Sequence, residues 1–152
     1  MDVNSFILGY TEGKKKGGGG GFDADAYFSV GLEEVNLEKA TTLRVYAIYN
    51  VATLKRLTFP NLETLNMFSI SNCSGLTSLT FPKSFRSSGT LAVSSCIALT
   101  EVTFEGKPTG SIASMFNACN NLKTINVPWA QGEVAGAPWG ATAATINYNY
   151  GG

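Results

Sequence analysis

The feature that most constrains this chain is a short segment that recurs five times at nearly constant spacing. Each copy begins with a leucine, and consecutive starting leucines lie 22, 22, 23 and 23 residues apart. The five copies start at Leu32, Leu54, Leu76, Leu99 and Leu122. A fixed period of about 20–50 residues is the signature of a repeat architecture in which each unit packs on its neighbours. The sequence therefore predicts a solenoid.

Within each copy, apolar and polar side chains alternate. In residues 54–60, for example, Leu57 and Phe59 flank Thr58. Because successive side chains of a strand point to opposite faces, Leu57 and Phe59 are expected to point inward and Thr58 outward. The segments that follow, such as residues 42–49, are rich in β-branched and aromatic residues and are predicted to form a second extended segment. The chain is therefore expected to be mainly β, with about five coils of 22–23 residues.

Stacked coils place equivalent residues of successive copies side by side, with parallel strands about 4.8 Å apart. Hydroxyl and amide side chains then form one outward ladder and can bond along the stack. The ladder contains Asn36, Thr58, Thr80, Thr103 and Asn126. The outward strand face is the predicted contact surface for a ligand. Its candidate residues are Arg56, Thr58, Ser78, Thr80, Glu101 and Thr103.

Three cysteines occupy the same position in successive copies, three residues before a starting leucine. They are Cys73, Cys96 and Cys119. A small buried side chain suits this corner, so the sequence predicts three reduced, buried thiols. Stacked side chains point in parallel directions, which is poor geometry for a disulfide. Ligands arranged along one axis do not converge, so the column is not expected to bind a metal ion.

The composition argues against the commonest kinds of catalysis. The chain has no histidine, which removes the most frequent general base and metal ligand. Residues 9–15 resemble a phosphate-binding loop only superficially, because the glycine spacing is one residue short and Lys15 stands where a magnesium-binding hydroxyl is needed. Asp23 and Asp25 are a candidate calcium pair, with a solvated linker edge as the simpler interpretation. The chain is therefore predicted not to be an enzyme and to need no cofactor.

Charge and hydropathy narrow the choice of partners. Eleven basic residues balance eleven acidic ones, so the chain lacks the basic footprint that nucleic acid requires. No segment approaches the roughly 18–20 apolar residues that span a bilayer. The amino terminus has neither an early basic region nor a small-residue cleavage site, so it is not a secretory signal. We therefore expect a protein that is made in the cytoplasm and recognises its partners by shape and local contacts.

The first 16 residues are predicted to form a docking peptide. Its apolar contact residues are Phe6, Ile7, Leu8 and Tyr10. Asn4 or Ser5 can cap a short helix that carries them, and lysines 14–16 suit its negative end. Five consecutive glycines make residues 17–22 a flexible tether between this peptide and the repeats. A disordered leader is the alternative interpretation of this end.

Residues 23–128 form the predicted solenoid, and residues 129–152 form its carboxy-terminal cap. A cap is required because the last coil has a neighbour on one side only. Trp129 and Trp139 are expected to cover the open end, and residues 145–150 alternate as a closing strand. An aromatic binding site is the alternative role for the two tryptophans.

The segment Cys-Ser-Gly-Leu-Thr-Ser-Leu-Thr-Phe-Pro, residues 73–82, resembles the BspA-like leucine-rich repeats. The unit of that family reads approximately Ala-Phe-x-x-Cys-x-x-Leu-x-x-Ile-x-Ile-Pro, and the likeness extends over residues 32–128. The Ala-Phe half departs from the pattern, for example at Ser69-Ile70 and Ala92-Val93. The resemblance implies a leucine-rich-repeat fold and a bacterial surface molecule that binds host or bacterial ligands. It transfers no catalytic residue.

The two ends, residues 5–21 and 126–150, are similar to the ends of virion proteins encoded by phages of gut Firmicutes. This resemblance implies a virion accessory protein, on the tail or the capsid surface, that is made in the host cytoplasm and displays the solenoid. The expected partners are other virion proteins, bound through the amino terminus, and a host surface protein or glycan. Self-association is left open. The alternative is a fragment of a bacterial cell-surface adhesin.

The predicted register is testable through one inward leucine. Leu79→Ala should reduce the free energy of unfolding by about 2–5 kcal/mol, because it removes buried methyl groups and leaves a cavity. Denaturant unfolding of the two proteins measures this difference. A loss below about 0.5 kcal/mol, the range of surface substitutions, would show that Leu79 does not face the core.

Overall fold

The computed structural model describes residues 22–24 and 32–151. Every regular element assigned within these residues is a strand, so the mainly β prediction is confirmed there. The expected amino-terminal helix and the predicted docking residues lie outside the described residues, as does Asp25. The docking residues are Phe6, Ile7, Leu8 and Tyr10.

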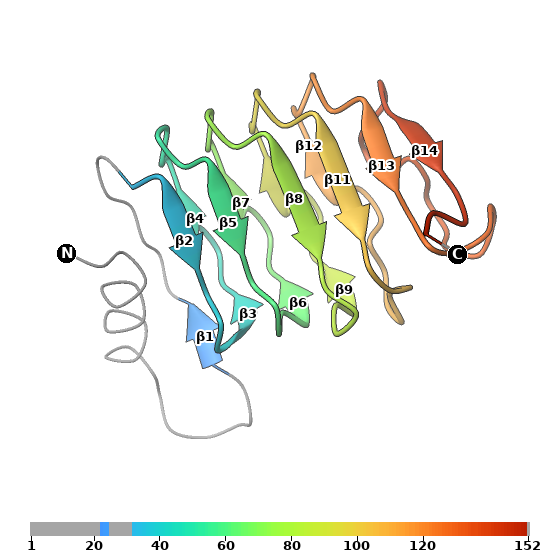
Figure 1. Ribbon diagram of the computed structural model, residues 1–152, viewed down its shortest axis with the longest axis horizontal. Helices are drawn as coiled ribbons and strands as arrows, with labels where there is room; N and C mark the ends of the chain where they lie inside the picture. The colour runs from blue at the N-terminus through green and yellow to red at the C-terminus, as the bar shows by residue number, and fades with distance from the viewer. Residues whose placement is uncertain (1–21, 25–31, 152) are drawn as a thin grey trace.

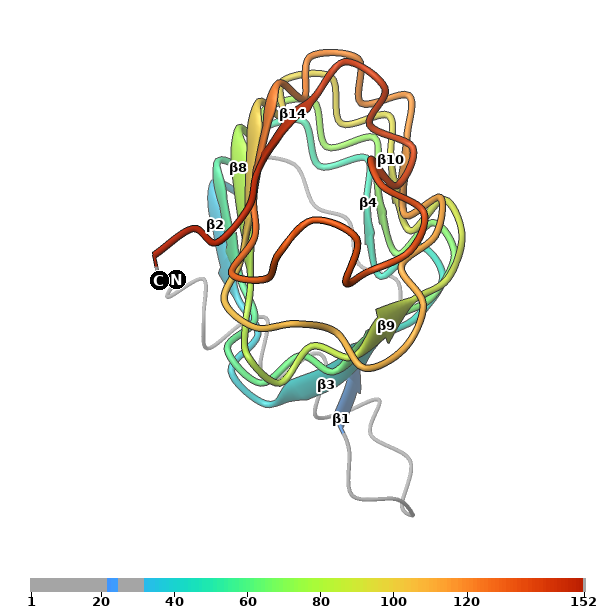
Figure 2. The same cartoon turned by 90° about the vertical axis from the view of Figure 1, so that its right-hand side faces the viewer.

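The chain winds into a stack of coils, and its strands lie on three faces of the stack (Figures 1 and 2). The first face carries β2 (Glu34–Asn36), β5 (Arg56–Thr58), β8 (Ser78–Phe81), β11 (Glu101–Phe104), β13 (Thr124–Asn126) and β14 (Thr145–Asn147). The second carries β1 (Phe22–Ala24), β3 (Ala40–Leu43), β6 (Thr64–Leu65) and β9 (Ser87–Ser88). The third carries β4 (Ile48–Tyr49), β7 (Ile70–Ser71), β10 (Val93–Ser94) and β12 (Phe116–Asn117).

Strand pairing follows the repeat register. The paired strands are parallel, and β8, β11 and β13 align equivalent residues of consecutive coils, as in the row Leu79, Val102 and Ile125. These three side chains and Leu57 are buried, with at most 4% of their surface exposed. The predicted inward positions are therefore confirmed. A one-residue slip would turn every one of them toward solvent, so burial fixes the register.

A column of aromatic rings fills the core at the end of the first face. The ring centroids of Phe59 and Phe81 are 5.4 Å apart, those of Phe81 and Phe104 are 5.1 Å apart, and those of Phe104 and Trp129 are 5.4 Å apart. These separations suit offset and edge contacts between aromatic rings. The column joins four consecutive coils through side chains alone, so it does not depend on backbone pairing.

The prediction of one extended segment for residues 42–49 is wrong in one respect. The segment forms two short strands, β3 and β4, with a corner at Tyr46, where φ is 57°. Phe68 and Leu91 take the same left-handed conformation in the next coils. That conformation costs an L-residue about 1–2 kcal/mol. It is held by hydrogen bonds from each corner to the next, since Tyr46 N donates to Phe68 O at 3.1 Å and Phe68 N to Leu91 O at 3.1 Å.

The cysteines form the expected buried column. Cys73, Cys96 and Cys119 are free thiols with at most 6% of their surface exposed. Each sulfur donates to the carbonyl two residues before it, at 3.4–3.6 Å. The hydrogen bond with Cys119 lowers the pKa of Cys96. The hydrogen bond with Cys73 and the burial of the thiol act in the opposite direction and raise the pKa of Cys96 to about 12. The hydrogen bond with Cys96 and burial raise the pKa of Cys119, so both thiols stay protonated at neutral pH.

The two ends of the described stack continue the same pattern. β1 pairs with β3 and begins at Phe22, the residue that the sequence analysis placed last in the tether. At the other end β14 pairs in register with β13. Trp129 and Trp139 are 3% and 0% exposed, so they cover the end of the core as predicted and cannot present their rings to a ligand.

The cap closes where Gly140 meets the preceding coil. A Cβ on Gly140 would collide with the Phe116 carbonyl, whereas one on Gly132 would meet nothing within 4 Å, and both residues have φ near +90°. Gly132→Ala should therefore cost only the backbone strain of about 1–2 kcal/mol. Gly140→Ala should cost at least about 1 kcal/mol more, because the cap must also move. Thermal or denaturant unfolding of the pair tests this, and equal losses would contradict the close approach.

Candidate functional site

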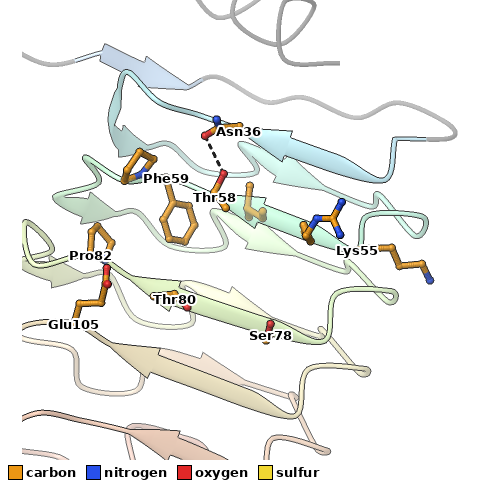
Figure 3. Close-up of a pocket in the computed structure, with 11 residues that line it drawn as sticks. Asn36, Lys55, Thr58, Phe59, Ser78, Thr80, Pro82 and Glu105 are labelled. Carbon is orange, nitrogen blue, oxygen red and sulfur yellow. Dashed lines mark hydrogen bonds between the residues drawn. The ribbon is translucent and has the colours of Figure 1, made fainter. Parts of the chain in front are cut away.

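A groove of about 470 Å³ opens on the first face between β5 and β8 (Figure 3). Thr58 lines it from β5, and Ser78 and Thr80 line it from β8. Lys55 lies at one end of the groove, and Glu105 lies at the other. Small-molecule sites in proteins usually measure about 300–1,000 Å³, so the groove is large enough to hold part of a ligand.

The groove coincides with a break in the first face. The strands of this face form two separate sheets, β2–β5 and β8–β11–β13–β14, so β5 and β8 are neighbours that do not pair. Lys55 N donates to Glu33 O at 2.7 Å, and Thr100 N donates to Thr77 O at 2.9 Å. Within residues 32–151, no equivalent bond joins Thr77 N to Lys55 O. The backbone is therefore left unpaired along the groove.

The same gap recurs at the other end of the two strands. Leu37 N donates to Thr58 O at 2.8 Å, but the described residues show no matching bond from Phe59 N to Thr80 O. Glu105 N donates to Phe81 O at 2.9 Å, whereas Pro82, at the equivalent position one coil earlier, has no N–H to offer Phe59. Pro82 thus contributes to the break. It is not the sole cause, because Pro60 precedes it by one coil and β2 and β5 still pair.

Side-chain hydrogen bonds show the same interruption. In the outward ladder, Thr58 Oγ1 donates to Asn36 Oδ1 at 2.9 Å. Further along, Asn126 Nδ2 donates to Thr103 Oγ1 at 3.1 Å, and Asn147 Nδ2 donates to Asn126 Oδ1 at 2.8 Å. The predicted ladder is therefore present in two blocks. Thr80 lies between them, and within the described part of the chain its hydroxyl has no hydrogen-bond partner.

Opposite charges mark the groove. Arg56 forms an ion pair with Glu34, whose carboxylate oxygen lies 2.6 Å from the guanidinium. The hydrogen bond and charge of Glu34 raise the pKa of Arg56. Both side chains are largely exposed, so solvent screens the pair and it contributes little to stability. Between the charged ends, the walls present neutral hydroxyl and backbone groups together with apolar groups such as the rings of Pro60 and Pro82.

The structure brings together four of the six residues predicted for the contact surface. Arg56, Thr58, Ser78 and Thr80 all line the groove. Glu101 and Thr103 lie one strand away on β11, and both bond to Asn126, at 3.1 Å each. Sequence analysis did not identify Asn36, Lys55, Pro82 or Glu105 as lining residues. Asn36 was predicted as an outward ladder residue, and the other three could have been indicated only by their place in the repeat, next to predicted outward positions.

The lining of the groove supplies hydroxyl, amide and backbone groups and a few separated charges. The part of the chain that the structure describes contains no group of three or more side chains able to hold a metal ion. Nor do the described residues include a helix long and apolar enough to cross a membrane. A three-faced parallel coil with buried leucine and cysteine columns and a polar strand face defines a leucine-rich-repeat domain.

Comparison with known families specifies the class of repeat. A family model for the BspA type leucine rich repeat region matches residues 22–134 in six copies. The chain therefore belongs to the BspA-type leucine-rich-repeat family. No curated protein and no solved structure matches it.

Two residues of the ladder should respond differently to substitution. Asn126 is 2% exposed and bonds to Glu101, Thr103 and Asn147. Asn126→Ala should cost about 1–3 kcal/mol of unfolding free energy, because it removes three side-chain hydrogen bonds that each contribute about 0.5–1.5 kcal/mol. Thr80→Val should change stability by less than about 0.5 kcal/mol, since its exposed hydroxyl makes no bond within residues 32–151. Denaturant unfolding measures both values, and a large loss for Thr80→Val would mean that the ladder is continuous.

Proposed function

We propose that this chain is a displayed binding module and not an enzyme, with the first face as its contact surface. The observation that carries the proposal is the groove between β5 and β8, where an otherwise regular face leaves hydroxyl and backbone groups unpaired. Unsatisfied polar groups at a concave surface are available to a ligand, whereas the side chains of Thr103 and Asn126 further along the face are engaged by neighbouring coils.

The rest of the molecule supports a binding role. In the described coils, the inward side is filled by apolar side chains. The chain has no histidine, and the charged residues that line the groove do not cluster as a pair of acids. Leucine-rich-repeat domains of the BspA type are protein-binding or adhesin-type modules, as the resemblance to that family implies. The ligand we propose is a host surface protein or glycan.

We further propose that the module is a phage virion accessory protein, on the tail or the capsid. In this proposal residues 1–16 bind other virion proteins through Phe6, Ile7, Leu8 and Tyr10, and residues 17–22 tether the solenoid to the particle. The support is the sequence itself, an apolar segment followed by lysines and five glycines. A bacterial cell-surface adhesin fragment is the competing assignment.

Particles that carry altered chains test both parts of this proposal. Deletion of residues 2–16 should abolish incorporation into particles and leave the solenoid folded, because the described strands pair and pack with one another within residues 22–24 and 32–151. Incorporation is measured by protein analysis of purified particles, and folding by circular dichroism of the separate protein. Particles that still contain the truncated chain would exclude amino-terminal docking.

A groove variant tests the contact surface in the same particles. Thr80→Arg places a long, charged side chain in the groove and should be incorporated normally while reducing attachment to host cells. Thr142→Arg is the matched control, since Thr142 is exposed in the cap, away from the groove. Equal attachment by the two variants would show that the first face is not the contact surface.

A further inference from the structure

The proposed contact surface has a geometry that selects among ligand classes. β5 and β8 do not pair, yet their Cα atoms still come within 8 Å of each other. A peptide strand inserted between them would need about 4.8 Å on either side, or about 9.6 Å in total. The break is therefore too narrow to accept a strand by addition to the sheet edges.

A protein surface is also a poor match for the groove. Protein interfaces draw most of their affinity from aromatic and arginine anchors in a desolvated centre. The arginine of the groove, Arg56, is exposed and paired with Glu34. The large exposed apolar side chains of the described residues lie elsewhere. They are Val45, Tyr46, Tyr49, Met67, Ile97 and Tyr150, and none of them lines the groove.

The groove presents neutral groups that donate and accept hydrogen bonds, beside apolar groups such as the rings of Pro60 and Pro82. Thr58, Ser78 and Thr80 contribute hydroxyls, each of which can donate and accept. The backbone of two lining residues adds the N–H group of Phe59 and the carbonyl of Lys55, which lack their inter-coil partners within residues 32–151. A ligand that satisfies this surface must itself carry many closely spaced groups that both donate and accept.

The charged residues around the groove restrict the class of ligand further. The ion pair with Glu34 compensates Arg56, and the exposed charges of Lys55 and Glu105 lie at opposite ends of the groove. The middle of the groove is uncharged, so an anionic polymer would gain at one end and be repelled at the other. A neutral ligand meets no such opposition.

We infer that the groove between β5 and β8 binds a neutral oligosaccharide, whose hydroxyls pair with the hydroxyl and backbone groups left free by the break in the first face. Sugar hydroxyls both donate and accept, and they are spaced closely along the chain. This inference relies on the proposed function only for the choice of the first face as the contact surface. It requires no particle and no amino-terminal docking.

Amide NMR of the full-length protein labelled with nitrogen-15 tests the inference. The probes are maltotetraose, cellotetraose, mannotetraose and chitotetraose. Each is titrated to about 10 mM, because a weak site has a dissociation constant of about 1 mM. At least one should shift the amide signals of β5 and β8 and leave those of the third face unchanged. An acetylated and amidated Glu-Thr repeat peptide at the same concentration should shift neither strand.

Two variants make the test specific. Thr80→Val removes one hydroxyl with little change in shape and should weaken binding at least about tenfold, the effect of losing about 1.4 kcal/mol. Thr142→Arg should bind like the natural chain. The amide spectrum of each variant reports whether it is folded, independently of binding.

Three results would overturn the inference: no shift with any of the saccharides, shifts confined to other faces, or shifts in β5 and β8 with the peptide alone. None of them bears on incorporation into particles. Conversely, the chain could bind a saccharide at β5 and β8 and yet never be incorporated into particles. That result would support the inference and refute the virion role. The two proposals can therefore fail separately.

Discussion

The structure depends on stacking of equivalent residues along one axis. A single coil has too little apolar surface to bury alone, so its leucines are sealed only by the coils above and below it. The spacing of 22–23 residues brings Leu57, Leu79 and Val102 into one row, and it also brings the cysteines into a second row and the phenylalanine rings into a third. This spacing therefore determines which side chains of adjacent coils are in contact.

Much of this could be predicted from sequence because period-two alternation and a constant repeat length are local signals. Leu79 had to point inward, and Cys96 had to lie between Cys73 and Cys119, in any fold with that register. The left-handed corners at Tyr46 and Phe68 could not be predicted in the same way. Bulky aromatic residues normally avoid that conformation, and here it is imposed by backbone hydrogen bonds from the next coil.

The candidate site was predictable only in part, for a related reason. Alternation identified Thr58, Ser78 and Thr80 as outward residues, which is a property of each strand alone. The groove depends instead on whether two strands pair, and pairing is a property of the assembled stack. Pro82 is the one local signal for the break, and it is ambiguous because Pro60 occupies the equivalent position beside an unbroken pair. Lys55 and Glu105 acquire their positions at the ends of the groove only through that break.

The break between β5 and β8 also makes the solenoid mechanically uneven. Inter-coil hydrogen bonds run along the axis of the stack, so a pull on its two ends loads every interval in series. At this interval the second and third faces carry the load through β6–β9 and β7–β10, while the first face carries none through its strands. Tension along the axis would therefore separate the coils first on this face. The groove between β5 and β8 would widen while the second and third faces stayed paired.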